Sequence, residues 1–232
     1  MNEELYSQAE AKALLCKTLV LSFVELIVFA AAVFVGYACI PSYYALFVSG
    51  GLMIAACVLH NLRLGAWRYP IATFLNAVAA GLAVSAYYAA LALPLQGWWV
   101  LIVTVGLLIL SALSCFLVSR GWKAFSVIVA VVYIAALITL IALWCGQPKA
   151  EGLYALSAMA LVFFASSLIP YFIVWDDSDE VTRTVSFWSF TVALLVALVS
   201  LVAIAIAGGD CDCDCAPDCC DCGTDGKKKK KR

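Results

Sequence analysis

Residues 17–40 read KTLVLSFVELIVFAAAVFVGYACI, and Lys17 and Glu25 are the only charged residues in this run. As an α-helix rising 1.5 Å per residue, the run is about 36 Å long. That is enough to cross a hydrocarbon core of about 30 Å, and apolar runs of this length with few charges are typical of transmembrane helices. The stretch therefore predicts a membrane-spanning first helix.

Six further apolar blocks follow, and the whole chain has the composition that such blocks produce. Of its 232 residues, 66% are apolar and 12% are charged, whereas soluble domains have about 45–50% and about 25%. We therefore predict an all-α integral membrane protein, a bundle of seven transmembrane helices with short loops. The predicted spans are Lys17–Ile40, Tyr43–Leu62, Ile71–Leu93, Trp98–Val118, Lys123–Cys145, Leu153–Trp175 and Arg183–Ala207.

The spans divide the chain into three parts. Residues 1–16 form a polar N-terminal segment leading into the first helix, residues 17–207 the transmembrane domain, and residues 208–232 a disordered tail rich in Cys and Asp, then in Lys. Ser7 and Glu10 have capping-box spacing, which predicts that the first helix begins before the membrane and runs straight in. The acidic, polar start lacks the basic region of a signal peptide, so we expect the first helix to be an uncleaved anchor.

Basic residues in short loops favour the cytoplasm, and their distribution predicts a cytoplasmic N-terminus. On that reading the outer loops hold only Lys149. With seven spans the tail lies outside and adds six basic residues to the outer side, which evens the count. We favour the outer tail because all seven blocks are long; the alternative is a miscounted span with both termini inside. The basic residues of the inner side are Lys12, Lys17, Arg63, Arg68, Arg120, Lys123 and Arg183.

Polar residues gather in the cytoplasmic halves of the predicted spans. Thr18, Ser22 and Glu25 form one helical stripe that we expect to face the bundle interior, because ionisable groups are costly in lipid. With Asn76, Ser186 and Ser189 they predict a polar, cytoplasm-facing vestibule. In the alternative, hydroxyl groups bond to carbonyls of their own helices, and Glu25, protonated or paired, fastens two helices together.

Two smaller patterns concern helix packing and the single histidine. Ala77, Gly81 and Ser85 have the small-xxx-small spacing that lets another helix approach closely, as do Gly51 and Ala55. His60 ends the second span, where we expect its side chain to extend to the membrane interface.

The acidic cluster Asp176, Asp177, Asp179 and Glu180 precedes the last span and is the best sign of an enzyme. Such carboxylates hold Mg²⁺ for diphosphate chemistry, or bind an ion or headgroup. We favour instead the role of acids that cap a helix N-terminus. Signatures of hydrolases, zinc proteases and nucleotide-binding loops are absent from the sequence.

The tail reads DCDCDCAPDCCDC from Asp210 to Cys222. Its thiols suit a soft, thiophilic metal ion, the only cofactor that the sequence suggests. Disulfides, palmitoylation and a disordered segment without a ligand are the alternatives that stay open. The six tail cysteines are Cys211, Cys213, Cys215, Cys219, Cys220 and Cys222.

Together these features predict a transporter of small solutes or ions, or an accessory membrane subunit, that uses the cytoplasm-facing polar surface, and we favour this class over an enzyme. One alternative is a membrane-bound enzyme acting on a lipid or diphosphate at the acidic loop. Another is a metal-handling membrane protein using its tail. We expect the plasma or inner membrane as its location and the lipid bilayer as a partner. A second copy or another membrane protein is a further candidate partner, and we expect no nucleic acid.

Overall fold

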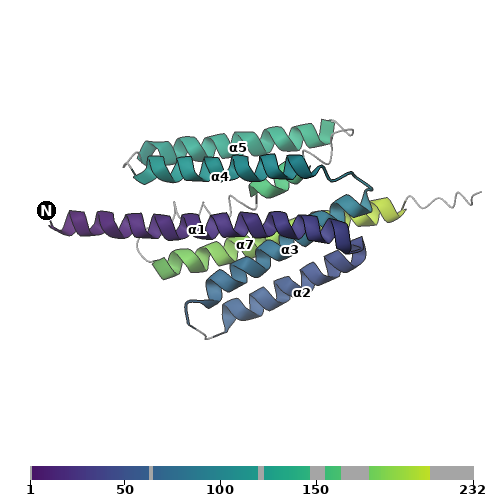
Figure 1. The fold of residues 1–232 in the computed structure, drawn as a ribbon, viewed down its shortest axis with the longest axis horizontal. Helices are drawn as coiled ribbons and strands as arrows, with labels where there is room; N and C mark the ends of the chain where they lie inside the picture. The colour runs from purple at the N-terminus through teal and green to yellow at the C-terminus, as the bar shows by residue number, and fades with distance from the viewer. Residues whose placement is uncertain (1, 63–64, 120–122, 147–154, 163–177, 210–232) are drawn as a thin grey trace, which may run out of the picture.

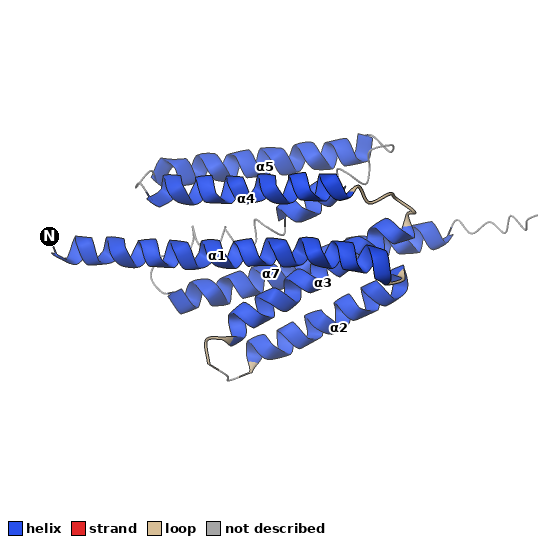
Figure 2. Ribbon diagram, viewed as in Figure 1, coloured by secondary structure: helices blue, strands red, loops and turns tan. Residues whose placement is uncertain are grey.

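The computed structural model describes residues 2–62, 65–119, 123–146, 155–162 and 178–209. These residues form helices joined by short turns, with no strand among them (Figure 2). Residues 155–162 are also helical. The long helices are α1 (Asn2–Cys39), α2 (Ser42–Asn61), α3 (Arg68–Ala90), α4 (Gly97–Ser119), α5 (Lys123–Gly146) and α7 (Ser178–Gly209).

The helices run side by side along one long direction (Figure 1). Helix α3 packs against α1, α2 and α7, and α4 packs against α1 and α5. Most of α3 is buried, and its many alanines let its neighbours come close. The indole N–H of Trp99 donates to the Ser157 hydroxyl at 3.1 Å, which ties the start of α4 to residues 155–162.

The helix surfaces indicate a membrane protein. Among the described residues, four stretches are long and apolar enough to cross a membrane: Val20–Cys39, Ser42–Asn61, Arg68–Ala90 and Glu180–Ala205. Helix α2 carries large apolar side chains on its outer face, among them Phe47, which is 84% exposed. Soluble proteins rarely expose such a continuous apolar surface to water, whereas a membrane protein can bury it against lipid tails. Shorter apolar stretches occur in the described parts of α4 and α5.

Helices α1 and α3 cross at close range, as the small-residue spacing of α3 predicts. A β-carbon added to Gly81 would lie 2.6 Å from the Phe29 carbonyl oxygen and from the Ala32 side chain. One added to Gly36 would clash with the side chain of Ser85. Glycine is therefore required at both positions by the approach of the other helix.

The second small-residue pair makes no such contact. Gly51 has open space where a β-carbon would lie, and Ala55 is exposed. Within the described residues, the expected close approach at Gly51 and Ala55 is therefore wrong. The pair faces the outside of α2, where a small side chain only leaves apolar surface for lipid.

Three predicted boundaries need correction. Helix α1 begins at Asn2, so Ser7 and Glu10 lie inside it, and the expected capping box at its start is wrong. The helix does begin well before the apolar run, as predicted. Helix α7 begins at Ser178 rather than Arg183. Most of the sixth predicted span, Leu153–Trp175, lies outside the described residues.

The third correction concerns the end of α3, which lies at Ala90 rather than Leu93. Ala92 has a φ of 50°, and the Leu93 N–H donates to the Tyr88 carbonyl at 2.9 Å. The Ala92 N–H donates to the Ala89 carbonyl at 3.4 Å. This pair of bonds around a left-handed residue is the Schellman ending of a helix, here with alanine where glycine is usual.

Candidate functional site

Polar side chains from three helices are buried in one half of the bundle. Ser22 and Glu25 of α1 are 0% and 3% exposed, so they face the interior as their helical spacing predicts. The Thr18 side chain lies outside the described part. Asn76 of α3 and Ser186 of α7 are joined directly, because the Asn76 amide donates to the Ser186 carbonyl at 3.4 Å.

We call Thr73, Asn76, Ser186 and Ser189 the polar interior; they lie on α3 and α7, and all four are buried. Three of their side-chain oxygens form no hydrogen bond with any described residue: Asn76 Oδ1, Thr73 Oγ1 and Ser189 Oγ. Buried polar atoms without partners are costly in a membrane. The polar interior therefore has spare hydrogen-bonding capacity.

Other hydroxyl groups follow the alternative that the sequence left open. Thr139 and Ser200 donate to the carbonyls of Ala135 and Val196, four residues back in their own helices, at 2.8 and 2.9 Å. Such bonds satisfy the hydroxyl within one helix. The polar residues thus divide into a group with local bonds and a group that reaches other helices.

His60 extends the polar interior to the end of α2. Its Nδ1 lies 3.1 Å from the Ser186 hydroxyl of α7. Its ring meets the Tyr69 ring edge-on, with centroids 5.2 Å apart. The side chain turns toward α7, and the expected extension of His60 to the membrane interface stays a prediction.

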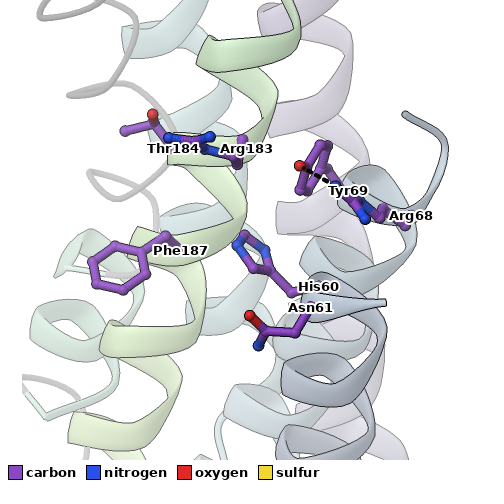
Figure 3. Close-up of a pocket in the computed structure, with 7 residues that line it drawn as sticks. All are labelled: His60, Asn61, Arg68, Tyr69, Arg183, Thr184 and Phe187. Atoms are coloured by element: carbon purple, nitrogen blue, oxygen red, sulfur yellow. Dashed lines mark hydrogen bonds between the residues drawn. The ribbon is translucent and has the colours of Figure 1, made fainter. Parts of the chain in front are cut away.

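A pocket of about 490 Å³ opens beside His60, between the end of α2 and the starts of α3 and α7. Figure 3 shows the His60 ring lying between α2 and α7. Such a volume is typical of small-molecule sites. We call it the basic pocket; it is lined by His60, Asn61, Arg68, Tyr69, Arg183, Thr184 and Phe187.

The two arginines of the basic pocket are held differently. Arg68 donates to the Leu62 carbonyl and, at 2.6 Å, to the Tyr69 hydroxyl (Figure 3). Its guanidinium carbon lies 4.6 Å from the centroid of the Tyr69 ring. Arg183 is exposed and forms no hydrogen bond or ion pair with another described residue. Arg68 therefore shapes the pocket wall, and Arg183 is available to a ligand.

Glu25 lies at a different pocket, of about 400 Å³. Thr182 is the other polar residue among the described residues of its lining. We call this cavity the Glu25 pocket. Because it involves α1, α3 and α7, it lies on the α1 side of the α3–α7 pair, whereas the basic pocket lies on the α2 side. Its lining is Val20, Leu21, Val24, Glu25, Pro70, Ile71, Phe74 and Thr182.

The acidic cluster and the tail fall largely outside the described residues. Asp179 and Glu180 lie in the first turn of α7, and Glu180 is exposed. Asp176, Asp177 and the six tail cysteines are not described. Within the described part of the chain, no three His, Cys, Asp or Glu side chains form a group that would hold a metal ion. The ion and metal hypotheses remain predictions.

The sequence did not predict the basic pocket as a site. Arg183 contributed to the orientation only, and Tyr69, Thr184 and Phe187 received no role. One signal was present: Arg68 lies near the start of the third predicted span and Arg183 at the start of the seventh, and both spans enter the membrane from the same predicted side. Sequence spacing does not show that α2, α3 and α7 are neighbours, so it cannot bring these residues together.

No family model matches the chain, and comparisons with curated proteins and with solved structures give no match.

Proposed function

We propose that the chain is a seven-span membrane carrier for a small organic anion, with its N-terminus in the cytoplasm and its anion site in the basic pocket. The observation that carries the proposal is the convergence of Arg68, Arg183 and His60 around one pocket of about 490 Å³. Three helices supply these groups, so the site depends on the assembled bundle.

The chemistry of the lining suits an organic anion. An arginine fork binds carboxylate and phosphate oxygens with two parallel hydrogen bonds, and Arg183 has this capacity. Asn61 and Thr184 add neutral hydrogen-bonding groups, while Tyr69 and Phe187 add aromatic surface. A ligand with an anionic group and a small apolar body would match both kinds of wall.

The polar interior supports transport rather than surface binding alone. His60 lines the basic pocket and contacts Ser186, and Asn76 contacts the Ser186 backbone in turn. These contacts lead from the pocket into the buried region between α3 and α7, where hydrogen-bonding capacity remains. A carrier needs such polar groups along the route of a polar solute.

The side of the membrane follows from the positive-inside rule. The end of α2 and the starts of α3 and α7, which form the basic pocket, belong to the same side in a seven-span order. Most basic residues of the short loops fall on that side, which favours the cytoplasm. We therefore propose that the anion enters from the cytoplasm.

The test is binding of radiolabelled phosphate and of radiolabelled benzoate to the purified full chain in nanodiscs of zwitterionic lipid. We expect saturable binding of benzoate, the anion of the two that has an apolar body. Arg183→Gln should weaken it by about tenfold or more, because a charge-assisted hydrogen bond contributes about 1.5–3 kcal/mol. Uptake of the bound anion into proteoliposomes then distinguishes a carrier from a receptor.

Lys17→Gln is the matched control, because it removes one positive charge from α1, a helix that supplies none of the described residues of the basic pocket. Equal losses in Lys17→Gln and Arg183→Gln would contradict a specific site and indicate general charge attraction. Absence of saturable binding to either anion would also contradict the proposal.

Reversing the charges of Asp176, Asp177 and Glu180 should leave carrier activity nearly unchanged, whereas the same change would abolish the activity of an enzyme that used these carboxylates.

A further inference from the structure

We propose that the anion of the basic pocket is a long-chain fatty acid of the cytoplasmic leaflet, whose carboxylate head binds Arg183 while its acyl tail stays in lipid along α7. This inference deepens the proposed function and rests on it, because it names the substrate class of the same site. It also gives a role to the exposed face of α7.

An exposed stripe of α7 begins at the basic pocket and runs along the helix. Arg183 and Phe187 line the pocket and are exposed. Three more exposed residues follow at spacings of three or four, so they continue the same helical face. The stripe therefore connects the charged group of the pocket with the outer surface of the helix. We call these residues the α7 stripe: Arg183, Phe187, Thr191, Leu194 and Leu198.

Beyond Arg183 the α7 stripe is an apolar surface. Phe187, Leu194 and Leu198 are 58%, 40% and 49% exposed. The Thr191 hydroxyl donates to the Phe187 carbonyl of its own helix at 3.0 Å, so it needs no polar partner outside the helix. Most of α7 belongs to one of the stretches able to cross a membrane. The α7 stripe is therefore suited to contact with a hydrocarbon chain.

The length of the α7 stripe matches the acyl tail of one leaflet. From Arg183 to Leu194 the helix rises about 16 Å at 1.5 Å per residue. This rise is close to half of a hydrocarbon core of about 30 Å, which is the depth of one leaflet. A head held at Arg183 therefore leaves its tail beside Phe187 and Leu194, at the depth that the tail of an inner-leaflet lipid already occupies.

The charge available in the basic pocket fits a single carboxylate. The Arg68 guanidinium donates to the Leu62 carbonyl and to the Tyr69 hydroxyl, whereas Arg183 forms no hydrogen bond or ion pair with another described residue. One guanidinium binds one carboxylate with two parallel hydrogen bonds. A single available guanidinium beside a single apolar stripe favours a single-chain carboxylate over a diacyl lipid with a phosphate headgroup.

The test is photolabelling of the full chain, in nanodiscs of zwitterionic lipid, by radiolabelled palmitate that carries a diazirine in the middle of its tail. We expect the label at Thr191, Leu194 or Leu198. Leu195 is the internal control: it is 53% exposed, but it lies about 100° around the helix from Leu194, and it should carry little label. Excess palmitate should remove the label, whereas methyl palmitate, which lacks the charge, should not.

Arg183→Gln should lower the affinity for the palmitate probe by about tenfold or more, because it removes a charge-assisted hydrogen bond. Lys17→Gln should leave this affinity unchanged. Equal label on Leu194 and Leu195, or label that excess palmitate does not remove, would overturn the inference and indicate general contact with lipid. Displacement by methyl palmitate, or equal displacement by phosphatidylglycerol, would also overturn it. These competitions use the unaltered chain, so they decide the inference even if Arg183→Gln fails to fold.

Failure of this inference and failure of the proposed function give different results. Saturable benzoate binding that palmitate does not displace would overturn the fatty acid and leave the site for a small anion in place. Saturable labelling of the α7 stripe, without faster transfer of palmitate between the leaflets of proteoliposomes, would contradict the carrier and leave the fatty-acid site in place.

Discussion

Ser49 of α2 is completely buried, and its hydroxyl donates to the Ala79 carbonyl of α3 at 2.7 Å. The carbonyl of a helical residue already accepts a bond within its helix, so the serine uses a second lone pair. Polar contacts of this kind hold helices together where burial of apolar surface gives no advantage over lipid. Single hydroxyl groups can therefore contribute measurably to the stability of this bundle.

We expect Ser49→Ala to lower the free energy of unfolding by about 0.5–1.5 kcal/mol, the range for hydrogen bonds between membrane helices. The measurement is reversible unfolding in mixed micelles with increasing sodium dodecyl sulfate. Thr191→Val is the control, because the Thr191 hydroxyl donates at 3.0 Å to Phe187 in its own helix. A larger loss in Thr191→Val than in Ser49→Ala would contradict the assignment of Ser49 as a contact between helices.

At the scale of elements, the packing of α1 on α3 depends on Gly36 and Gly81. The contacts at Gly81 include a backbone oxygen, that of Phe29, which cannot move aside without moving α1. Overpacking of this kind costs about 1–3 kcal/mol. Helix α1 carries the buried Glu25, and α3 carries the buried Asn76. The crossing of α1 and α3 therefore also positions these two polar residues relative to each other.

We expect Gly81→Ala to lower the free energy of unfolding by about 1–3 kcal/mol in the same micelle titration. Gly51→Ala is a close control: it makes the same substitution within a helix, at a site where a new β-carbon meets no atom within 4 Å. It should be neutral or stabilising by up to about 1 kcal/mol, since alanine favours the helix. Equal effects of the two substitutions would show that the α1–α3 crossing does not limit stability.

At the scale of the whole molecule, the order of the helices decides which helix ends meet to form a pocket and on which side of the membrane they lie. The ends that form the basic pocket meet because α2, α3 and α7 pack together. An odd number of spans, as we propose, would place the tail, with its six cysteines, on the side opposite the N-terminus. The compartment of the tail then governs whether its cysteines meet an oxidising environment.

We expect reporter fusions to place the N-terminus in the cytoplasm and the C-terminus outside. The physical reason is the excess of basic residues in the short loops on the N-terminal side of the membrane. The measurement compares a reporter active only outside the cytoplasm with one active only inside, each fused to either end. Both termini on one side would show an even number of spans, and the proposed seven-span order would be wrong.

Some of this arrangement was predictable from the residues. A stripe such as Ser22 and Glu25 can be assigned to the interior because helical periodicity fixes which residues share a face, and lipid rejects charge. The close contact at Gly81 follows from small residues four apart. The failure at Gly51, which has the same spacing, shows that the pattern permits a contact without choosing its partner.

The sequence by itself determined the helical, membrane-spanning character of the chain, because 20-residue apolar runs have few stable alternatives in lipid. It also determined which residues are too polar to face lipid. The tertiary structure alone decided that Glu25 and Arg183 lie at separate pockets, on opposite sides of α3 and α7. That separation depends on which helices are neighbours and on how each is rotated about its axis, and both result from packing between segments far apart in the sequence.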